Sequence, residues 1–483
     1  MSPDERVLRG FIVQLERLSK TVAAKRLFAG GREGYVDLQE SVFNLQVKLQ
    51  KTIGEVKRRG SRYPNVSAHL AHLRWLRWKS RRLGDAIAWW GLLLNRQLID
   101  ALAKNDPVPI PTSWSDGHLG AFQFARTMAG PEWGVPLVHD ITNVLRVGDV
   151  TFMRPTGQGT EAVYRTLELK TTRLSESVNE EGETILNLGV TAIGNEPFPA
   201  SPGDQPTDNS GTPPSAKPER ELVYHRRPDR RIDRQLARMD IATAGKNATL
   251  NKLTKIGDQY TLTLAMPEEE QPHWSELRRA IRQARRDGYA YFELGGFVGY
   301  SVFYNSAGVT EEQIQSTSRL ESVGGLVHEE IGERNSITIS SVPDEDNSTY
   351  SAKVLPFYLW EVPQRAIQDI LRRRLMIVAT YNSGWMEKLL ADAGLTVVPD
   401  EIGRDIRGFE VVASFEWEGE VAVEYHSHVW EEMFVAVHEF RGPNAVIQRA
   451  LAPIGAPGRL ALSELIPAVA GEAEEGLVSK TIA

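Results

Sequence analysis

Two β-rich runs on either side of a short turn constrain the fold of this chain more than any other feature. They cover residues 147–153 and 162–170, and Pro155-Thr156-Gly157-Gln158-Gly159 lies between them. A cluster of Pro and Gly between two such runs is typical of a β-hairpin. We therefore expect the two runs to pair as antiparallel strands.

The two faces of this hairpin differ in chemistry, because successive side chains of a strand point to opposite faces. One face is apolar and carries Val150, Phe152, Leu167 and Leu169. The other is polar and carries Asp149, Thr151, Thr166, Glu168 and Lys170. Burying such a row without partners is costly, so it either faces water or lines a site that uses its charges.

Two carboxylates on neighbouring strands suit a hard divalent cation. Mg²⁺ takes oxygen ligands in a near-octahedral shell, usually one or two carboxylates completed by water and substrate phosphate. Asp149 and Glu168 meet that need, and Lys170 stands two residues from Glu168 on the same face. An amine at that position is able to act on the reacting water or on developing charge.

Gly148-Asp149-Val150, the hairpin and Glu168-Leu169-Lys170 together resemble the signature of the PD-(D/E)xK superfamily of restriction-endonuclease-like nucleases, over residues of about 63–245. The resemblance implies that Asp149 and Glu168 hold Mg²⁺ or Mn²⁺ and that Lys170 positions or activates the attacking water. The family often has Pro-Asp at the first acid, whereas Gly148 precedes Asp149 here. It also implies a nuclease fold and phosphodiester hydrolysis.

A long helix is expected at about 64–104, with apolar residues on two sides. One line comprises Leu76, Leu83, Ile87, Trp90, Leu94 and Leu98, and the second comprises Trp78, Trp89 and Leu92. A helix of this kind is buried, and Asp85 falls on its second line. Members of the superfamily often carry an acid on a first helix, so Asp85 is a candidate third catalytic acid. The alternative is a buried Asp paired with Arg81 or Arg82.

Two further polar residues precede the first acid, in His139-Asp140-Ile141-Thr142-Asn143. Side-chain to backbone hydrogen bonds at a turn explain Asp140 and Asn143. A role of Asp140 with metal or substrate is the alternative.

A basic segment follows the hairpin region, with Arg226, Arg227, Arg230, Arg231, Arg234 and Arg238 close together and Gln235 among them. This density contrasts with a net charge of −7 and suits contacts with phosphates. The superfamily often places Gln or a basic residue on the helix after the Glu-x-Lys strand. We therefore expect contacts with DNA from Arg227, Arg231, Arg234 and Gln235. The alternative is that this segment is only a solvated charged surface.

The domain organisation follows from composition and periodicity. Amphipathic helices are expected at 4–27 and 37–59, broken at Ala29-Gly30-Gly31, and they serve packing or self-association. We expect a helical hairpin (1–62), a nuclease domain (63–250) with a disordered Pro/Ser-rich insertion (196–220), a C-terminal α/β accessory domain (270–455) and a flexible tail (456–483).

The C-terminal region reads as alternating helices and strands. The expected helices are Trp274–Arg286, Gln364–Arg374 and Gly384–Ala393, and the expected strands are Tyr289–Phe297, Gly299–Tyr304, Val354–Leu359, Leu375–Thr380, 409–416 and 420–426. Gly295-Gly296-Phe297-Val298-Gly299 lacks the phosphate-loop Lys and the dinucleotide spacing.

Composition excludes several classes of protein. The absence of Cys excludes disulfides, thiol catalysis and cysteine zinc fingers. A hydrophobic content of 41% and a charged content of 25% are ordinary for a globular protein. The most apolar run, Ala86 to Leu94, is too short to span a bilayer. Met1-Ser2-Pro3-Asp4-Glu5-Arg6 is not a basic segment followed by an apolar one, so we expect no secretory signal. We expect a soluble cytoplasmic protein with no membrane association.

The sequence thus predicts a mixed α/β protein with a restriction-endonuclease-like core. We expect it to be a DNA endonuclease that depends on Mg²⁺ or Mn²⁺. The family's usual roles further imply defence against foreign DNA. Two alternatives remain. His426, His428, Glu432 and His438 resemble a cupin metal motif, although the spacing to the next Gly is wrong and no second motif follows. Alternatively, the nuclease fold serves binding without catalysis, against which the intact Asp, Glu and Lys argue.

Overall fold

The computed structural model describes most of the chain in segments. These are residues 3–23, 31–60, 66–94, 96, 99, 102, 110–131, 133–145, 148–155, 162–178, 184–193, 252–256, 259–263, 270–305, 316–318, 325–343, 354–401, 407–417 and 420–455. Among the helices in these segments, none combines the length and apolarity that crossing a bilayer requires.

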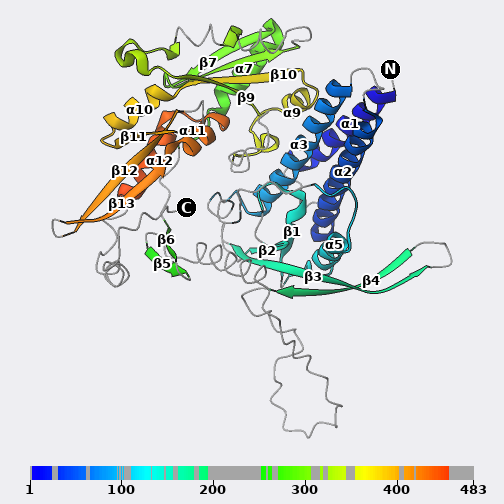
Figure 1. The fold of residues 1–483 in the computed structure, drawn as a ribbon. Coiled ribbons are helices and arrows are strands. Elements are labelled where there is room, and N and C mark those ends of the chain that lie inside the picture. The colour runs from blue at the N-terminus through cyan, green and yellow to red at the C-terminus, as the bar shows by residue number, and fades with distance from the viewer. Residues whose placement is uncertain are drawn as a thin grey trace.

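Three long helices form the N-terminal part of the molecule and lie side by side (Figure 1). They are α1 (Pro3–Ala23), α2 (Gly31–Arg59) and α3 (Val66–Gly91). The predicted pair of helices is confirmed, although α2 begins at Gly31, inside the predicted break and six residues before the predicted start at residue 37. The prediction of one helix over 64–104 was too long, because Leu93 and Leu94 adopt positive φ angles of 54° and 59° and end the α3 geometry.

Helix α3 is buried on both predicted sides. Leu76, Leu83, Ile87, Trp78, Trp89 and Leu92 all lie in the core. Its second half is buried so completely that its charged residues Lys79, Arg81, Arg82 and Asp85 are also inside the protein. Each of them therefore needs polar partners there.

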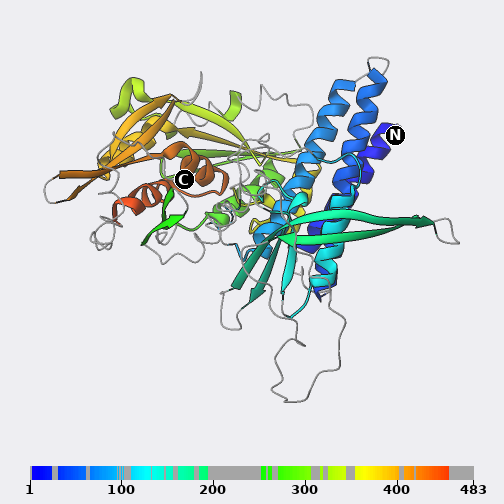
Figure 2. The same cartoon turned by 60° about the horizontal axis from the view of Figure 1, so that its bottom comes forward.

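A four-stranded antiparallel sheet with the order β1-β2-β3-β4 packs beside the helices. Its strands are β1 (Val135–Val138), β2 (Val150–Pro155), β3 (Ala162–Val178) and β4 (Thr184–Ile193). Strands β2 and β3 pair with Val150 opposite Leu167 and Thr151 opposite Thr166, so the predicted hairpin is confirmed. Beyond the sheet, β3 and β4 continue as a two-stranded arm that extends away from the helices (Figure 2).

Helix α2 completes the free edge of β1. The Gln39 amide donates to the carbonyl of Pro136 at 2.9 Å, and its oxygen accepts the Val138 N–H at 2.8 Å. Gln46, two turns further on, donates to the carbonyl of Ile141 at 2.8 Å. The N-terminal helices therefore share one packed unit with the sheet, and buried residues of α2 face the inside of this chain.

The C-terminal region combines sheets and helices, and all the strand pairs among its described residues are antiparallel, whereas an alternating α/β fold has parallel strands. One sheet has the order β7-β8-β10-β9 and another β11-β12-β13, and β5 and β6 form a separate pair. The strands are β5 (Lys252–Ile256), β6 (Gln259–Thr263), β7 (Tyr289–Leu294), β8 (Val298–Tyr304), β9 (Ile337–Val342), β10 (Leu375–Asn382), β11 (Thr396–Glu401), β12 (Arg407–Trp417) and β13 (Glu420–His428).

The three helices predicted in this region are confirmed as α7 (Trp274–Asp287), α9 (Gln364–Leu371) and α10 (Ser383–Asp392). Three further helices were not predicted, namely α11 (Val429–His438) and α12 (Pro443–Gly455) of this region and α5 (Asp116–Met128) before the first sheet. Short 3₁₀ turns are η2 (His139–Ile141), η3 (Glu329–Arg334) and η5 (Phe357–Leu359). The strand predicted at Val354–Leu359 was wrong. Residues 357–359 form η5, where Phe357 and Tyr358 are buried without a neighbouring strand to pair with.

Contacts between the helical bundle and the C-terminal region are numerous and polar as well as apolar. Arg372 binds Glu16 through two hydrogen bonds of 2.5 and 2.9 Å. The buried Lys79 lies over the rings of Trp78 and Phe357, with Nζ 4.4 and 4.8 Å from their centroids. Apolar residues of both halves belong to a single contiguous core.

Candidate metal centre

Gly148 directs the chain into the strand that carries the first acid. Its φ angle is +76°, and a Cβ there would lie 2.7 Å from Thr166 Cγ2 and 2.9 Å from the Leu167 carbonyl oxygen. Proline has φ fixed near −65° and is incompatible with this conformation. The turn therefore explains why Gly, and not the family's Pro, precedes Asp149.

Asp149 is fixed from the neighbouring strand. Its backbone N–H donates to the carbonyl of Leu167 at 2.7 Å, and its carboxylate Oδ2 accepts the Leu169 N–H at 2.7 Å. Glu168 directly follows Leu167, the pairing partner of Val150, and its negative charge lies close enough to Asp149 to raise the pKa of that carboxyl. The structure thus brings together the two acids that the sequence predicted as metal ligands.

Glu168 is buried, with only 4% of its surface exposed. Its Oε1 lies 3.3 Å from Lys170 Nζ, and its Oε2 is buried without a hydrogen-bond partner. The Lys170 side chain is 42% exposed, so the amine reaches from solvent to the buried carboxylate. A buried carboxylate oxygen that accepts no hydrogen bond costs free energy unless a bound cation neutralises it.

The two threonines of the polar face, the buried Thr151 and the half-buried Thr166, form a chain of hydrogen bonds with His139. Its Nδ1 lies 3.0 Å from the Gly148 carbonyl, which only accepts, so Nδ1 carries the proton and Nε2 accepts from the Thr151 hydroxyl at 2.8 Å. Thr151 in turn lies 2.8 Å from Thr166 Oγ1. Sequence reasoning gave His139 no role, and only its place directly after a buried strand pointed to one.

The electrostatics of Asp149 reflect this crowding. Burial and the neighbouring negative charge of Glu168 together raise the pKa of Asp149 to about 7, against the opposing hydrogen bond from the Leu169 N–H. Asp140 adds to the increase and Lys170 reduces it. Lys170 supplies one positive charge beside these two carboxylates, and a divalent cation would offset the repulsion that remains between them.

The raised pKa of Asp149 predicts a pH-dependent stability of the metal-free protein. The folded state holds a proton on Asp149 up to about pH 7, whereas the unfolded chain releases it near its ordinary value of 3.8, so stability falls as the pH rises between these values. A shift of about three units corresponds to about 4 kcal/mol at most. Asp149→Asn should not lose stability as the pH rises, because its amide does not titrate. Its amide oxygen can still accept the Leu169 N–H.

We therefore expect Asp149→Asn in chelator to melt higher than the wild type at pH 8 and nearly equally at pH 4.5. Thermal unfolding followed by circular dichroism at both pH values measures the difference. Glu168→Gln serves as the matched control, because removing the second charge also relieves Asp149. Parallel pH profiles for wild type and Asp149→Asn would contradict the assignment.

Asp85 lies away from this pair and has a full set of partners. Its side chain is completely buried, and Oδ1 accepts the backbone N–H groups of Asn143 at 2.5 Å and Val144 at 3.1 Å. Oδ2 lies 3.1 Å from Arg82 Nη1. The geometry matches the structural alternative, in which Arg82 neutralises Asp85, and the acid holds the segment that leads into β2.

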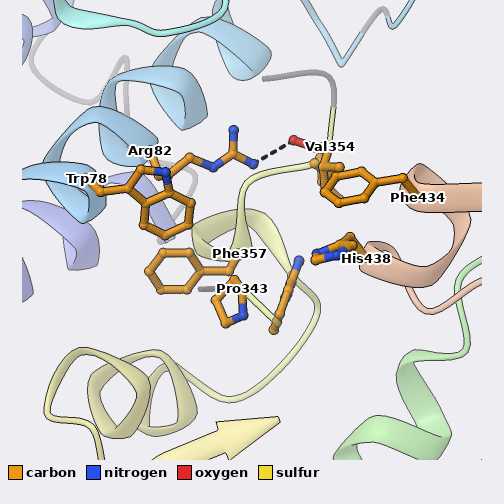
Figure 3. Close-up of a pocket in the computed structure, with 9 residues that line it drawn as sticks. Trp78, Arg82, Pro343, Val354, Phe357, Phe434 and His438 are labelled. Carbon is orange, nitrogen blue, oxygen red and sulfur yellow. Dashed lines mark hydrogen bonds between the residues drawn. The ribbon is translucent and has the colours of Figure 1, made fainter. Parts of the chain in front are cut away.

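Arg82 extends the same connection to the C-terminal region. Figure 3 shows its guanidinium reaching from α3 to the carbonyl of Val354, a hydrogen bond of 2.7 Å. The small cavity beside it has room for about 20 Å³, lined by Trp78, Phe357 and His438 among others. That volume holds about one water molecule, so it is no substrate pocket.

Asn143 and Asp140 belong to the segment that Asp85 holds. Asn143 Oδ1 accepts from Arg81 Nε at 3.0 Å, and Arg81 also donates to the Asp140 carbonyl at 2.5 Å. The Asn143 side chain is thus held by the α3 side chains of Arg81 and Asp85, whereas the prediction was of side-chain to backbone hydrogen bonds at a turn. The Asp140 side chain is free of these contacts and lies 3.7 Å from His118 Nε2.

Several predicted residues fall outside the described part of the chain. These are Arg227, Arg231, Arg234 and Gln235, together with the 196–220 insertion and the 456–483 tail. Of the cupin-like set, the side chains of His426 and His428 are likewise outside it. Glu432 pairs with Arg449, and His438 Nε2 lies 3.1 Å from Ser340 Oγ while its ring stacks on Phe434. These two residues are committed to other contacts.

The donor set at Asp149 and Glu168 fits a cation that keeps much of its hydration. Within the described residues, no three or more His, Asp or Glu are grouped to hold a metal ion. Two carboxylates, one with an unpartnered oxygen, suit Mg²⁺ or Mn²⁺ better than a cation that needs a closed protein cage.

Comparison of the chain with protein-family models, curated proteins and solved structures gives no significant match. The assignment of these residues as a metal site therefore depends on their geometry alone.

Proposed function

We propose that this chain is a metal-dependent DNA endonuclease with a PD-(D/E)xK-like site at Asp149, Glu168 and Lys170. The observation that carries the proposal is the buried Glu168 carboxylate, which has one oxygen without a partner and lies close enough to Asp149 to raise the pKa of that carboxyl. Two neighbouring carboxylates repel each other and are costly to bury, so their presence here favours a site that binds a cation.

Each side chain has a separate task in phosphodiester hydrolysis. Asp149, held by the Leu169 N–H, and Glu168 would hold a Mg²⁺ or Mn²⁺ ion, which supplies a more acidic bound water and neutralises phosphate charge. Lys170 is a mobile donor beside Glu168 and stabilises charge that develops on the reacting oxygens. The burial of Glu168 lowers the local dielectric constant and strengthens these interactions.

The basic segment around Arg227, Arg231 and Arg234 remains our prediction for the DNA contact, because cationic side chains near the site would bind phosphates. The helices and the C-terminal region hold the segment before β2 in place, as the Arg82 and Asp85 contacts show. Cytoplasmic location and a role in defence are part of the same proposal.

We expect the purified protein to nick or cut plasmid DNA with Mg²⁺ or Mn²⁺ and to do neither with chelator. Gel electrophoresis of timed samples measures cleavage, and Asp149→Asn, purified in parallel, excludes a contaminating nuclease. If the wild type cleaves neither DNA nor RNA with any divalent ion, the catalytic assignment is wrong and the fold serves as a binding module.

A further inference from the structure

Helix α5 brings a histidine to the edge of the carboxylate site. The helix crosses β3 at Gly120, where a Cβ would lie only 2.3 Å from Thr171 Oγ1. Its first turn is tied to the same strand by Asp116, which accepts from Arg173 Nη2 at 2.7 Å. The start of α5 is therefore fixed beside the strand that carries Glu168 and Lys170.

His118 is held in one orientation and one tautomer by the cap of this helix. The Ser115 N–H donates to His118 Nδ1 at 3.1 Å, and the His118 N–H donates to Ser115 Oγ at 3.3 Å, which together form a capping box. Since Nδ1 accepts, the proton of the neutral imidazole is on Nε2. The ring also packs on Phe43, with 4.8 Å between centroids.

The Nε2–H of His118 faces Asp140, whose neighbour in the sequence, His139, is hydrogen-bonded to the backbone of Asp149. Nε2 lies 3.7 Å from Asp140 Oδ2, just beyond direct hydrogen-bonding distance. Asp140 directly follows His139, whose N–H donates to the Asp149 carbonyl at 2.9 Å. The Asp140 side chain is 37% exposed, and its negative charge contributes to the raised pKa of Asp149. A hydrated carboxylate thus stands within electrostatic reach of the pair.

We propose that His118 is a positioning residue of the cation site and acts through Asp140, which accepts a hydrogen bond from water on a cation held by Asp149 and Glu168. Outer partners of this kind orient the ligands and the bound water, and their loss typically costs 10–100-fold in metal affinity or activity. The inference rests on the proposed function.

The row Ser115, His118 and Asp140 also contains the residue types of a nucleophilic triad. The Ser115 hydroxyl lies 2.8 Å from His118 Nδ1, but it also accepts the backbone N–H of His118 and serves as the N-cap of α5. The geometry is that of a helix cap joined to an acid, so we assign the row to positioning and not to covalent catalysis.

The test measures Mn²⁺ affinity by titration calorimetry, independently of cleavage. Asp140→Asn and His118→Leu are each expected to weaken Mn²⁺ binding by about 10-fold. His118→Gln should stay within about 2-fold of the wild type, because Gln at this position completes a capping box and offers an N–H to Asp140.

Two controls separate positioning from folding. Ala125→Gly removes a buried methyl group from α5 and lowers its helix propensity, so it should lower the melting temperature while leaving Mn²⁺ affinity unchanged. The double variant His118→Leu/Asp140→Asn should bind Mn²⁺ as Asp140→Asn alone does, since His118 acts through Asp140.

Wild-type affinity in His118→Leu, or additive losses in the double variant, would overturn the positioning role alone. A wild type that binds no Mn²⁺, or binds it equally after Glu168→Gln, would instead overturn the metal site and the proposed function with it.

Discussion

Asp85→Ala is expected to lower the free energy of unfolding by about 3–5 kcal/mol, the usual range when one partner of a buried ion pair is removed. The change leaves Arg82 charged inside the protein and deprives the N–H groups of Asn143 and Val144 of their acceptor. Denaturant unfolding with a constant m-value measures the loss. Asp37→Ala, which removes an exposed ion pair with Arg126, should cost at most about 1 kcal/mol.

Asp85→Asn distinguishes the structural role of Asp85 from a catalytic one. The amide keeps an acceptor for the two backbone N–H groups but removes the charge that Arg82 needs, so it should lose stability and retain cleavage in the fraction that is folded. A well-folded, stable Asp85→Asn protein without activity would restore Asp85 as a third catalytic acid.

Lys170→Met is expected to reduce the cleavage rate by about 10²–10⁴-fold, the range for loss of a positioned proton-transfer or charge-stabilising group. Mn²⁺ affinity should stay within a few-fold, because the amine holds no metal and lies 3.3 Å from Glu168 on the exposed side. Single-turnover cleavage and calorimetry measure the two quantities separately.

Asp149→Asn is the matched comparison, because it removes a ligand charge and should abolish both cleavage and tight metal binding. Leu167 and Leu169 stay packed in both variants, so both should fold. Equal cleavage by the wild type and Lys170→Met would remove Lys170 from the mechanism.

Local patterns predicted the part of the site that lies on one hairpin. Alternation along two strands placed Asp149, Glu168 and Lys170 on one face, and the register of β2 with β3 agrees. The amphipathic period predicted the helices for the same reason, since both patterns are local properties of the backbone. Gly148 was visible in the sequence, but its meaning required its positive φ.

Contacts between distant segments could not be predicted in this way. Arg82 meets Val354 across 272 residues, and Gln39 meets Pro136 across 97. No periodicity encodes such partners, because tertiary packing decides them. The same limit applies to His118, whose nearness to Asp140 depends on how closely α5 passes β3.

The shared core of the two halves has a consequence for dissecting the protein. A fragment that ends before α7 would retain Lys79, Arg82 and Glu16 but lose Phe357, Val354 and Arg372, the groups that cover or neutralise them. It would also expose apolar surface of α3. The boundary near residue 250 that composition suggests is therefore a poor place to cut, and the smallest unit able to carry the carboxylate site includes the C-terminal sheets.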